Sequence, residues 1–216
     1  MEEETLPFKC VAFDVDGTLL DTVKPDLMSL QKVIREETGQ TPSLEELRPL
    51  LGIPGVTALE QLGLPDPQAA FDKWAAYVRE YDHLITVFPG IWEVLDELRD
   101  RGVTLGLVTS RCRSELDRDV TRLGLLQYFR AVVCADDTER HKPDPDPLLK
   151  LLADTGMNPG DVLYIGDTIY DSQCARAAGV KFALALWGTM DPAIPCDYRL
   201  AHPAELLPLC RPAAEA

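Results

Sequence analysis

The stretch VAFDVDGTLLDT, residues 11–22, runs from an apolar, strand-like segment directly into two carboxylates. Asp14 and Asp16 are separated by a single residue, and side chains at positions i and i+2 of a strand lie on the same face. Both carboxylates could therefore address one site. Gly17 allows a sharp turn after them and lets backbone N–H groups approach a ligand. The same residue types are common in solvated turns, so the rest of the chain has to decide between a site and a turn.

Short apolar segments recur along the chain and predict the strands of one sheet. They are CVAFDV (10–15), VTLGLV (103–108), AVVCA (131–135), VLYIG (162–166) and VKFALAL (180–186). Nearly continuous apolar strands are typical of a parallel sheet that is covered on both faces. Segments with the apolar spacing of helices lie between them, for example residues 90–102. This alternation predicts a doubly wound α/β core with a mainly parallel sheet.

Residues 20–87 interrupt the alternation, because they contain several helical segments and no strand candidate. Within them, Ser43 and Glu46 have the spacing of a capping box. The interval is too long for a simple crossover between two strands. We therefore expect an inserted all-α cap domain at residues 20–87, and an α/β core domain made of residues 1–19 and 88–216.

Polar residues follow the other expected strands at the same kind of position. The second strand ends in Thr109 and Ser110, and the fourth is followed by Asp167 and Asp171. Ligands of parallel α/β sheets bind beyond the carboxyl ends of the strands. Between these segments, Lys142 precedes a proline that restricts its backbone. Each residue alone could be a helix cap or an exposed charge, but their combination in this order indicates a site.

Together these segments resemble the haloacid dehalogenase superfamily, in particular its phosphatases of the phosphoglycolate phosphatase type. DVDGTLLDT matches the first motif of that superfamily, VTS the second, Lys142-Pro143 the third and GDTIYD the fourth. The first and fourth motifs are specific in combination, whereas the second and third are weak alone. The resemblance covers nearly the whole chain. It implies a Rossmann-like core, with the helical interval as the superfamily's cap.

The resemblance implies a phosphatase that works with Mg²⁺ and forms an aspartyl-phosphate. Asp14 would be the nucleophile that attacks phosphorus. Asp16 would protonate the leaving alcohol and then activate the hydrolytic water. Asp14, Asp167 and the backbone carbonyl of Asp16 would hold the metal, and Asp171 would hold a metal-bound water. The dehalogenases of the superfamily lack the second Asp of the first motif, so Asp16 favours phosphoryl chemistry.

The phosphate would be bound by the remaining motif residues. Lys142 would contact both the nucleophile and the phosphate and offset the crowded negative charge. Thr109 or Ser110 would contribute a hydroxyl, and Thr109 is preferred because it ends the apolar segment directly. Backbone N–H groups near Ser110 and Gly17 would add further donors.

Composition excludes several other classes of function. The 216 residues carry a formal net charge of −15, which argues against nucleic-acid binding through a basic surface. The six cysteines are scattered without a Cys-x-x-Cys pair, so a zinc site or a disulfide scaffold is not expected. No apolar segment reaches the length of a membrane span, and the N-terminus has no signal-like apolar region. We expect a cytoplasmic protein.

Several alternatives remain open. A phosphomutase of the β-phosphoglucomutase type shares the aspartyl-phosphate, but that branch carries a charged cap loop where this chain has uncharged GIPGVT, with Arg48 as the nearest cation. A signalling module phosphorylated on Asp, like a response-regulator receiver, is smaller and has no cap. Arg111 and Arg113 could steer an anionic substrate, although an exposed, salt-bridged face is the simpler explanation. The expected partner is a small phosphorylated metabolite, and either a monomer or a homodimer is reasonable.

Overall fold

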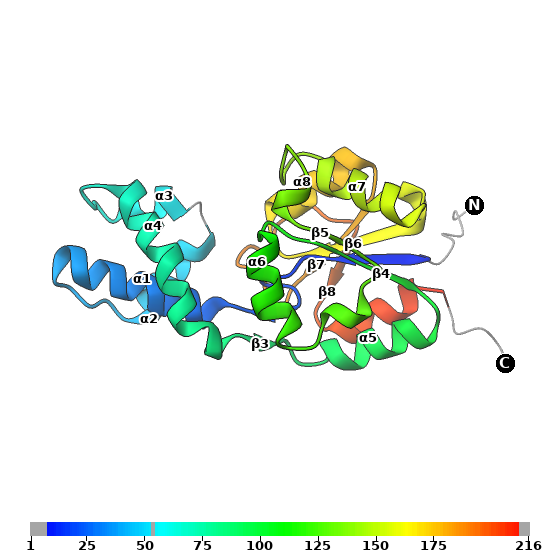
Figure 1. Ribbon diagram of the computed structural model, residues 1–216, viewed down its shortest axis with the longest axis horizontal. Coiled ribbons are helices and arrows are strands. Elements are labelled where there is room, and N and C mark those ends of the chain that lie inside the picture. Colours follow the sequence, from blue (N-terminus) through cyan, green and yellow to red (C-terminus); the bar gives the residue numbers. More distant parts are fainter. Residues whose placement is uncertain (1–7, 53–54, 212–216) are drawn as a thin grey trace. The chain divides into compact units, whose positions relative to one another are not determined.

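The computed structural model describes residues 8–52 and 55–211 (Figure 1). The chain separates into two compact units. One consists of the chain up to Leu20 together with the chain from Val87 onwards, and the other consists of Asp21–Thr86.

The first unit is built on a six-stranded sheet in the order β5-β4-β1-β6-β7-β8. Its strands are β1 (Cys10–Phe13), β4 (Thr104–Val108), β5 (Ala131–Val133), β6 (Val162–Gly166), β7 (Lys181–Ala185) and β8 (Tyr198–Leu200). Every neighbouring pair is parallel, which confirms the predicted mainly parallel sheet. Strand β8 was not predicted, because this three-residue edge strand buries only Leu200 and so lacks the apolar run of the others.

Helices cover both faces of this sheet, as a doubly wound fold requires (Figure 1). They are α5 (Ile91–Asp100), α6 (Arg113–Leu116), α7 (Asp146–Thr155) and α8 (Ile169–Ala178), with a 3₁₀ helix at Pro203–Leu209. Helices α7 and α8 lie on one face, and α5 lies on the other beside the 3₁₀ helix. Helix α6 is only four residues long, because it passes into a π-helical turn at Asp117–Thr121.

The second unit is helical. It contains α1 (Val23–Thr38), α2 (Leu44–Leu47), α3 (Gly55–Gln61) and α4 (Pro67–Val78), with 3₁₀ helices at Arg48–Gly52 and Arg79–Leu84. The predicted capping box of Ser43 and Glu46 is present at the start of α2. Trp74 of α4 packs in the core of the unit, and its indole N–H donates to the Asp26 carbonyl.

Two strands of two residues lie where none was expected, at the two chain crossings between the units. These strands, β2 (Leu20–Asp21) and β3 (Thr86–Val87), pair with each other. Two residues are too few to show a period, so the pairing could not be foreseen. No helix within residues 8–52 and 55–211 is both long and apolar enough to cross a membrane.

Candidate active site

The carboxyl ends of three adjacent strands bring the motif residues together. Phe13, the last residue of β1, is in register with Leu107 of β4 and Ile165 of β6. The residues that follow these strands therefore emerge at one edge of the sheet. The Asp14 N–H donates to the Ile165 carbonyl at 2.8 Å, which extends the ladder by one residue and fixes the backbone of Asp14.

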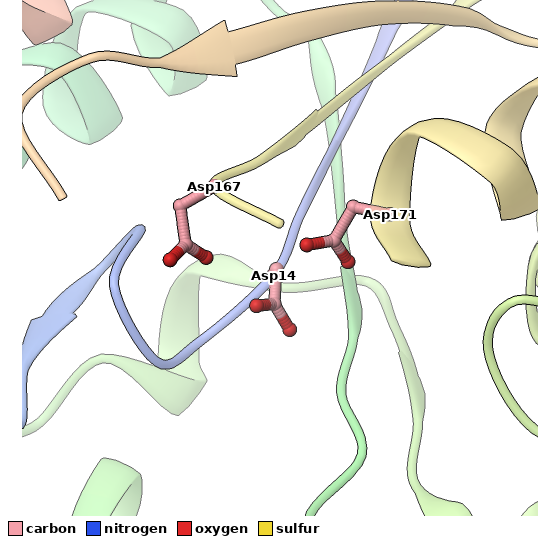
Figure 2. Close-up of side chains that lie close together, drawn as sticks. All are labelled: Asp14, Asp167 and Asp171. Atoms are coloured by element: carbon pink, nitrogen blue, oxygen red, sulfur yellow. The ribbon is translucent and has the colours of Figure 1, made fainter. Parts of the chain in front are cut away.

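Three carboxylates meet at this edge. Asp14, Asp167 and Asp171 each place an oxygen within 4.8 Å of the others (Figure 2). Asp14 is 6% exposed and Asp171 is fully buried. Asp171 is held by the start of α8, where Thr168 and Asp171 form a reciprocal capping box. Three carboxylates in so little water form a strongly negative site.

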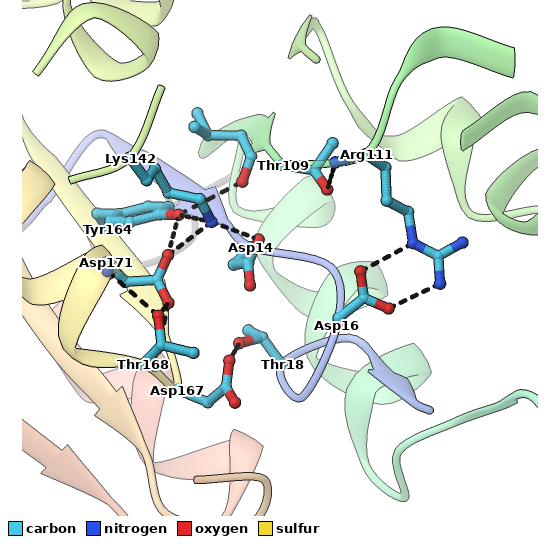
Figure 3. Close-up of polar contacts among 11 residues, drawn as sticks. Asp14, Asp16, Thr18, Thr109, Arg111, Lys142, Tyr164, Asp167, Thr168 and Asp171 are labelled. Carbon is cyan, nitrogen blue, oxygen red and sulfur yellow. Dashed lines mark hydrogen bonds and ion pairs between the residues drawn. The ribbon is translucent and has the colours of Figure 1, made fainter. Parts of the chain in front are cut away.

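Lys142 supplies a buried positive charge to this cluster. Its ammonium lies 2.8 Å from Asp14 Oδ1 and 2.7 Å from Asp171 Oδ1, and its side chain is 6% exposed (Figure 3). It also lies 3.2 Å from the hydroxyl of Tyr164, which is itself 2.8 Å from Asp171 Oδ1. The lysine is therefore fixed by contacts to three side chains.

The charges in the cluster shift one another's protonation. Burial raises the pKa of Asp14 to about 7; Lys142 opposes this rise, whereas Asp171 and Asp16 add to it. Burial and the nearby Asp14 carboxylate also hold the pKa of Asp167 well above its ordinary value. Burial acts in the same direction on Asp171, but contacts to Lys142, Thr168 and the Tyr164 hydroxyl outweigh it and lower the pKa of that carboxyl. Burial lowers the pKa of Lys142, but the two carboxylates it contacts outweigh burial and raise it.

The charge and the donor set of this cluster fit a divalent cation. One lysine cannot balance three clustered carboxylates, and the raised pKa values of Asp14 and Asp167 follow from the excess of negative charge. The available donors are all oxygens, which is the ligand set that hard cations such as Mg²⁺ prefer. Asp14 and Asp167 are the members whose carboxylates remain least engaged by protein donors, since Asp171 contacts Lys142, Tyr164 and Thr168.

The backbone approaches the acidic cluster closely at Gly17. Gly17 has a φ of +70°, and a Cβ there would lie 2.2 Å from Asp167 Oδ2. Its N–H, which we expected to face a phosphate, donates instead to the Leu20 carbonyl at 2.9 Å. The contribution of Gly17 visible in the fold is thus its missing side chain, which makes room for the Asp167 carboxylate.

Asp16 lies apart from the three clustered carboxylates. Its side chain is 41% exposed, and both of its oxygens accept hydrogen bonds from the guanidinium of Arg111, at 2.8 and 2.7 Å (Figure 3). Arg111 is only 13% exposed, so it is not part of an exposed, salt-bridged face as the simpler explanation held. Arg113 does fit that description, because it is 41% exposed and pairs with Asp137.

The two hydroxyl candidates after β4 differ in their surroundings. Thr109 is 4% exposed, and its Oγ1 accepts the Arg111 N–H at 3.1 Å. Ser110 is exposed. The geometry therefore favours Thr109 as the buried hydroxyl at the edge of the sheet. Arg48 is an exposed residue of the second unit, at the start of its first 3₁₀ helix.

Some residues of the site were missed from the sequence. Tyr164 lies within a strand that was treated only as apolar, and Asp119 lies in a segment interpreted only as helix. Thr18 is fully buried and donates to Asp167 Oδ1 at 3.5 Å. Thr168 could have been found, because a threonine three residues before Asp171 is the pattern of a capping box. The others carry no local signal of this kind.

The chain matches known proteins over most of its length. A family model described as haloacid dehalogenase-like hydrolase matches residues 11–185. The chain is 32% identical to the N-acetylmuramic acid 6-phosphate phosphatase of Pseudomonas aeruginosa, over 92% of this chain and 93% of that protein. It is 33% identical to the phosphoglycolate phosphatase of Thiobacillus denitrificans, over 83% of each.

A crystal structure of a HAD-superfamily hydrolase (subfamily IA, variant 1) from Geobacter sulfurreducens has a similar fold, with a TM-score of 0.78 and 30% identity. The likeness covers 94% of this chain and 97% of that one. The family match begins at β1 and runs through β7, so it includes all the strand ends that carry the acidic cluster. The chain belongs to the haloacid dehalogenase-like hydrolases.

Proposed function

We propose that this protein is a Mg²⁺-dependent phosphatase that hydrolyses a small phosphorylated metabolite through an aspartyl-phosphate on Asp14. The observation that carries the proposal is the buried Asp14 carboxylate, which touches Lys142 through Oδ1 and lies within one cluster with Asp167 and Asp171. Phosphatase names among the relatives point in the same direction.

Asp14 is the proposed nucleophile. Within residues 8–52 and 55–211, its carboxylate has one hydrogen-bond donor, Lys142, at Oδ1. The other oxygen is then the one that attacks phosphorus, forming the new P–O bond while the bond from phosphorus to the leaving oxygen breaks. Lys142 keeps its proton throughout, since Asp14 and Asp171 raise its pKa. Its charge therefore remains available to the phosphoryl oxygens as negative charge builds up on them.

Asp16 is the proposed proton carrier. As the leaving oxygen departs, it takes a proton from the Asp16 carboxyl group. In the second step, Asp16 accepts a proton from the water that attacks the phosphorus of the aspartyl-phosphate. Hydrolysis then releases inorganic phosphate and regenerates the Asp14 carboxylate. The greater exposure of Asp16 supports this role, because a proton carrier has to reach both the leaving group and water.

Asp14 and Asp167 would hold Mg²⁺, with the backbone carbonyl of Asp16 as a further ligand and Asp171 supporting a bound water. When bound, the ion would neutralise the clustered charge and orient the phosphoryl group for in-line attack. Thr109 would donate its hydroxyl to a phosphoryl oxygen, because its Oγ1 is already oriented by the Arg111 N–H. The peptide bond between Lys142 and Pro143 is cis.

The helical unit is proposed to act as the cap domain that recognises the rest of the substrate. Relatives act on N-acetylmuramic acid 6-phosphate or phosphoglycolate according to their names, so the substrate class proposed here is a small phosphate monoester. All six cysteines are free thiols, and four of them, Cys10, Cys134, Cys174 and Cys210, are buried. This pattern supports a reducing, cytoplasmic location.

The test is phosphate release from a panel of phosphate monoesters and pyrophosphate with Mg²⁺. We expect release by the native protein and by Asp154→Asn, which removes an exposed carboxylate on α7, but none by Asp14→Asn. Borohydride should reduce the acyl-phosphate on Asp14, and mass spectrometry should then identify Asp14 as the modified residue. Substantial turnover by Asp14→Asn would overturn the covalent mechanism, and transfer of phosphate between two positions of a sugar would instead identify a mutase.

A further inference from the structure

Arg111 lies between two carboxylates that come from distant parts of the chain. Its Nε and Nη2 donate to the two oxygens of Asp16, and its Nη1 donates to Asp119 Oδ2 (Figure 3 shows the Asp16 side). A guanidinium that binds both oxygens of one carboxylate fixes the plane of that group as well as its distance. The orientation of Asp16 is therefore set by Arg111 and not by solvent.

Asp119 is the anchor of this arrangement. It is fully buried and lies in the π-helical turn that follows α6. A second arginine, Arg118, contacts it at 3.1 Å from the solvent side. A buried charge pair adds little net stability compared with apolar residues of the same size, and π-helical turns occur frequently at functional sites. Both facts point to a requirement for the position of the Arg111 guanidinium.

The backbone of Arg111 is fixed as well. Its N–H donates to Thr109 Oγ1 at 3.1 Å, and its carbonyl accepts the Ala135 N–H at 2.9 Å. The N–H and the carbonyl of Arg111 are thus both hydrogen-bonded, and Asp119 contacts its guanidinium. Because its side chain is 13% exposed, it has little freedom to leave Asp16 for another partner.

We propose that Arg111 is a positioning residue that, anchored by Asp119, holds Asp16 in the orientation for proton transfer to the leaving group. This inference rests on the proposed function. A carboxylate has about four lone-pair sites, and the fork of Arg111 takes one on each oxygen. One site on each oxygen stays open. One of these open sites can hold the proton that passes from Asp16 to the leaving oxygen as the P–O bond breaks. Arg111 keeps its own protons throughout.

The dependence of the rate on the leaving group tests this role. An alkyl phosphate needs a proton on its leaving oxygen, whereas p-nitrophenolate leaves without one. The ratio of kcat/KM for an alkyl phosphate to that for p-nitrophenyl phosphate therefore reports on proton delivery. In Arg111→Met this ratio should fall by about tenfold or more, since general-acid catalysis contributes roughly 10²–10⁴-fold and depends on geometry.

Matched variants separate positioning from folding and charge. Arg111→Lys keeps a cation beside buried Asp119 but cannot bind both oxygens of Asp16, so the ratio should still fall. Asp119→Asn removes the charge that holds the guanidinium in place, so it should lower the ratio as well. Arg113→Met removes an arginine two residues away, paired with Asp137, and should leave the ratio unchanged. In an Asp16→Asn background, Arg111→Met should add nothing further, because residues that act through one another are not additive.

Three results would overturn the inference. A ratio within about twofold of the native value in folded Arg111→Met would show that Arg111 does not act through Asp16. An equal loss on both esters would instead identify Arg111 as a binding residue for the substrate anion. If Arg111→Met does not fold, as judged by circular dichroism, Arg111→Lys and Asp119→Asn give the same comparison. A native protein that is inactive on both esters would overturn the proposed function, and the inference with it.

Discussion

Removing divalent metal and raising the pH should destabilise the core of this protein, because the Asp14 carboxyl group resists ionisation in the folded state. Burial raises its pKa from the ordinary value of 3.8 to about 7, in spite of the opposing charge of Lys142. Asp167 is shifted in the same direction. In the metal-free protein, deprotonation therefore places uncompensated negative charge in a buried cluster.

The sign and the size follow from linkage. A carboxyl group whose pKa is raised by folding binds its proton more tightly in the folded state. Its contribution to stability is complete below about pH 3.8 and is lost as the pH rises through about 7. For these two values, the free energy of unfolding should fall by roughly 2–3 kcal/mol between about pH 5 and pH 8. Asp167 adds a loss of the same sign.

The assay is urea unfolding of chelator-treated protein at several pH values. Asp14→Asn should show a shallower fall between pH 5 and 8 than the native chain, and Asp154→Asn should follow the native chain. Adding Mg²⁺ should restore more stability near pH 8 than near pH 5, because the metal competes with protons for the same oxygens. If native protein and Asp14→Asn give parallel stability curves, the excess of buried negative charge in the site is not real.

Three further changes probe other contacts of the site. Lys142→Met removes the buried cation beside Asp14 and Asp171. We expect the free energy of unfolding in urea without metal to fall by about 3 kcal/mol, and kcat to fall at least about 100-fold. Near-native rates would mean that the phosphate binds elsewhere. Tyr164→Phe deletes a hydroxyl 2.8 Å from Asp171 Oδ1 and should cost about 1–2 kcal/mol in the same assay, and an unchanged midpoint would show that the hydroxyl is dispensable. Gly188→Ala would place a Cβ 1.7 Å from the Gly17 carbonyl oxygen, so it should lower the free energy of unfolding by about 2 kcal/mol or more. Its melting temperature and its phosphate release should both fall. Gly160→Ala, whose new Cβ has nothing within 4 Å, should change neither.

The sheet could be predicted because its signal is local. The core strands β1, β4, β5, β6 and β7 are each an apolar run, because burial on both faces of the sheet leaves little choice of residue. The short elements carry no such signal. The edge strand β8 buries one residue, and β2 and β3 contain two residues each, so their pairing partners decide their conformation.

The meeting of Asp14, Asp167 and Lys142 could also be expected from the sequence. Each carboxylate directly follows a strand, and parallel strands end at one edge of their sheet, so the order of motifs along the chain is enough to bring the carboxylates together. The functional roles of these residues remain predictions. For Gly17, the sequence suggested a free N–H, but the hydrogen bond of that N–H to Leu20 depends on how the turn closes.

The sequence by itself thus determined which side chains gather at the edge of the sheet, because that follows from strand order and chain direction. Only the tertiary structure decided how each charge is compensated. Asp16 and Arg111 are 95 residues apart in the chain, and Asp119 reaches the same guanidinium from a π-helical turn. Pairing of charges depends on distance and burial in three dimensions, and neither is written in the local spacing of residues.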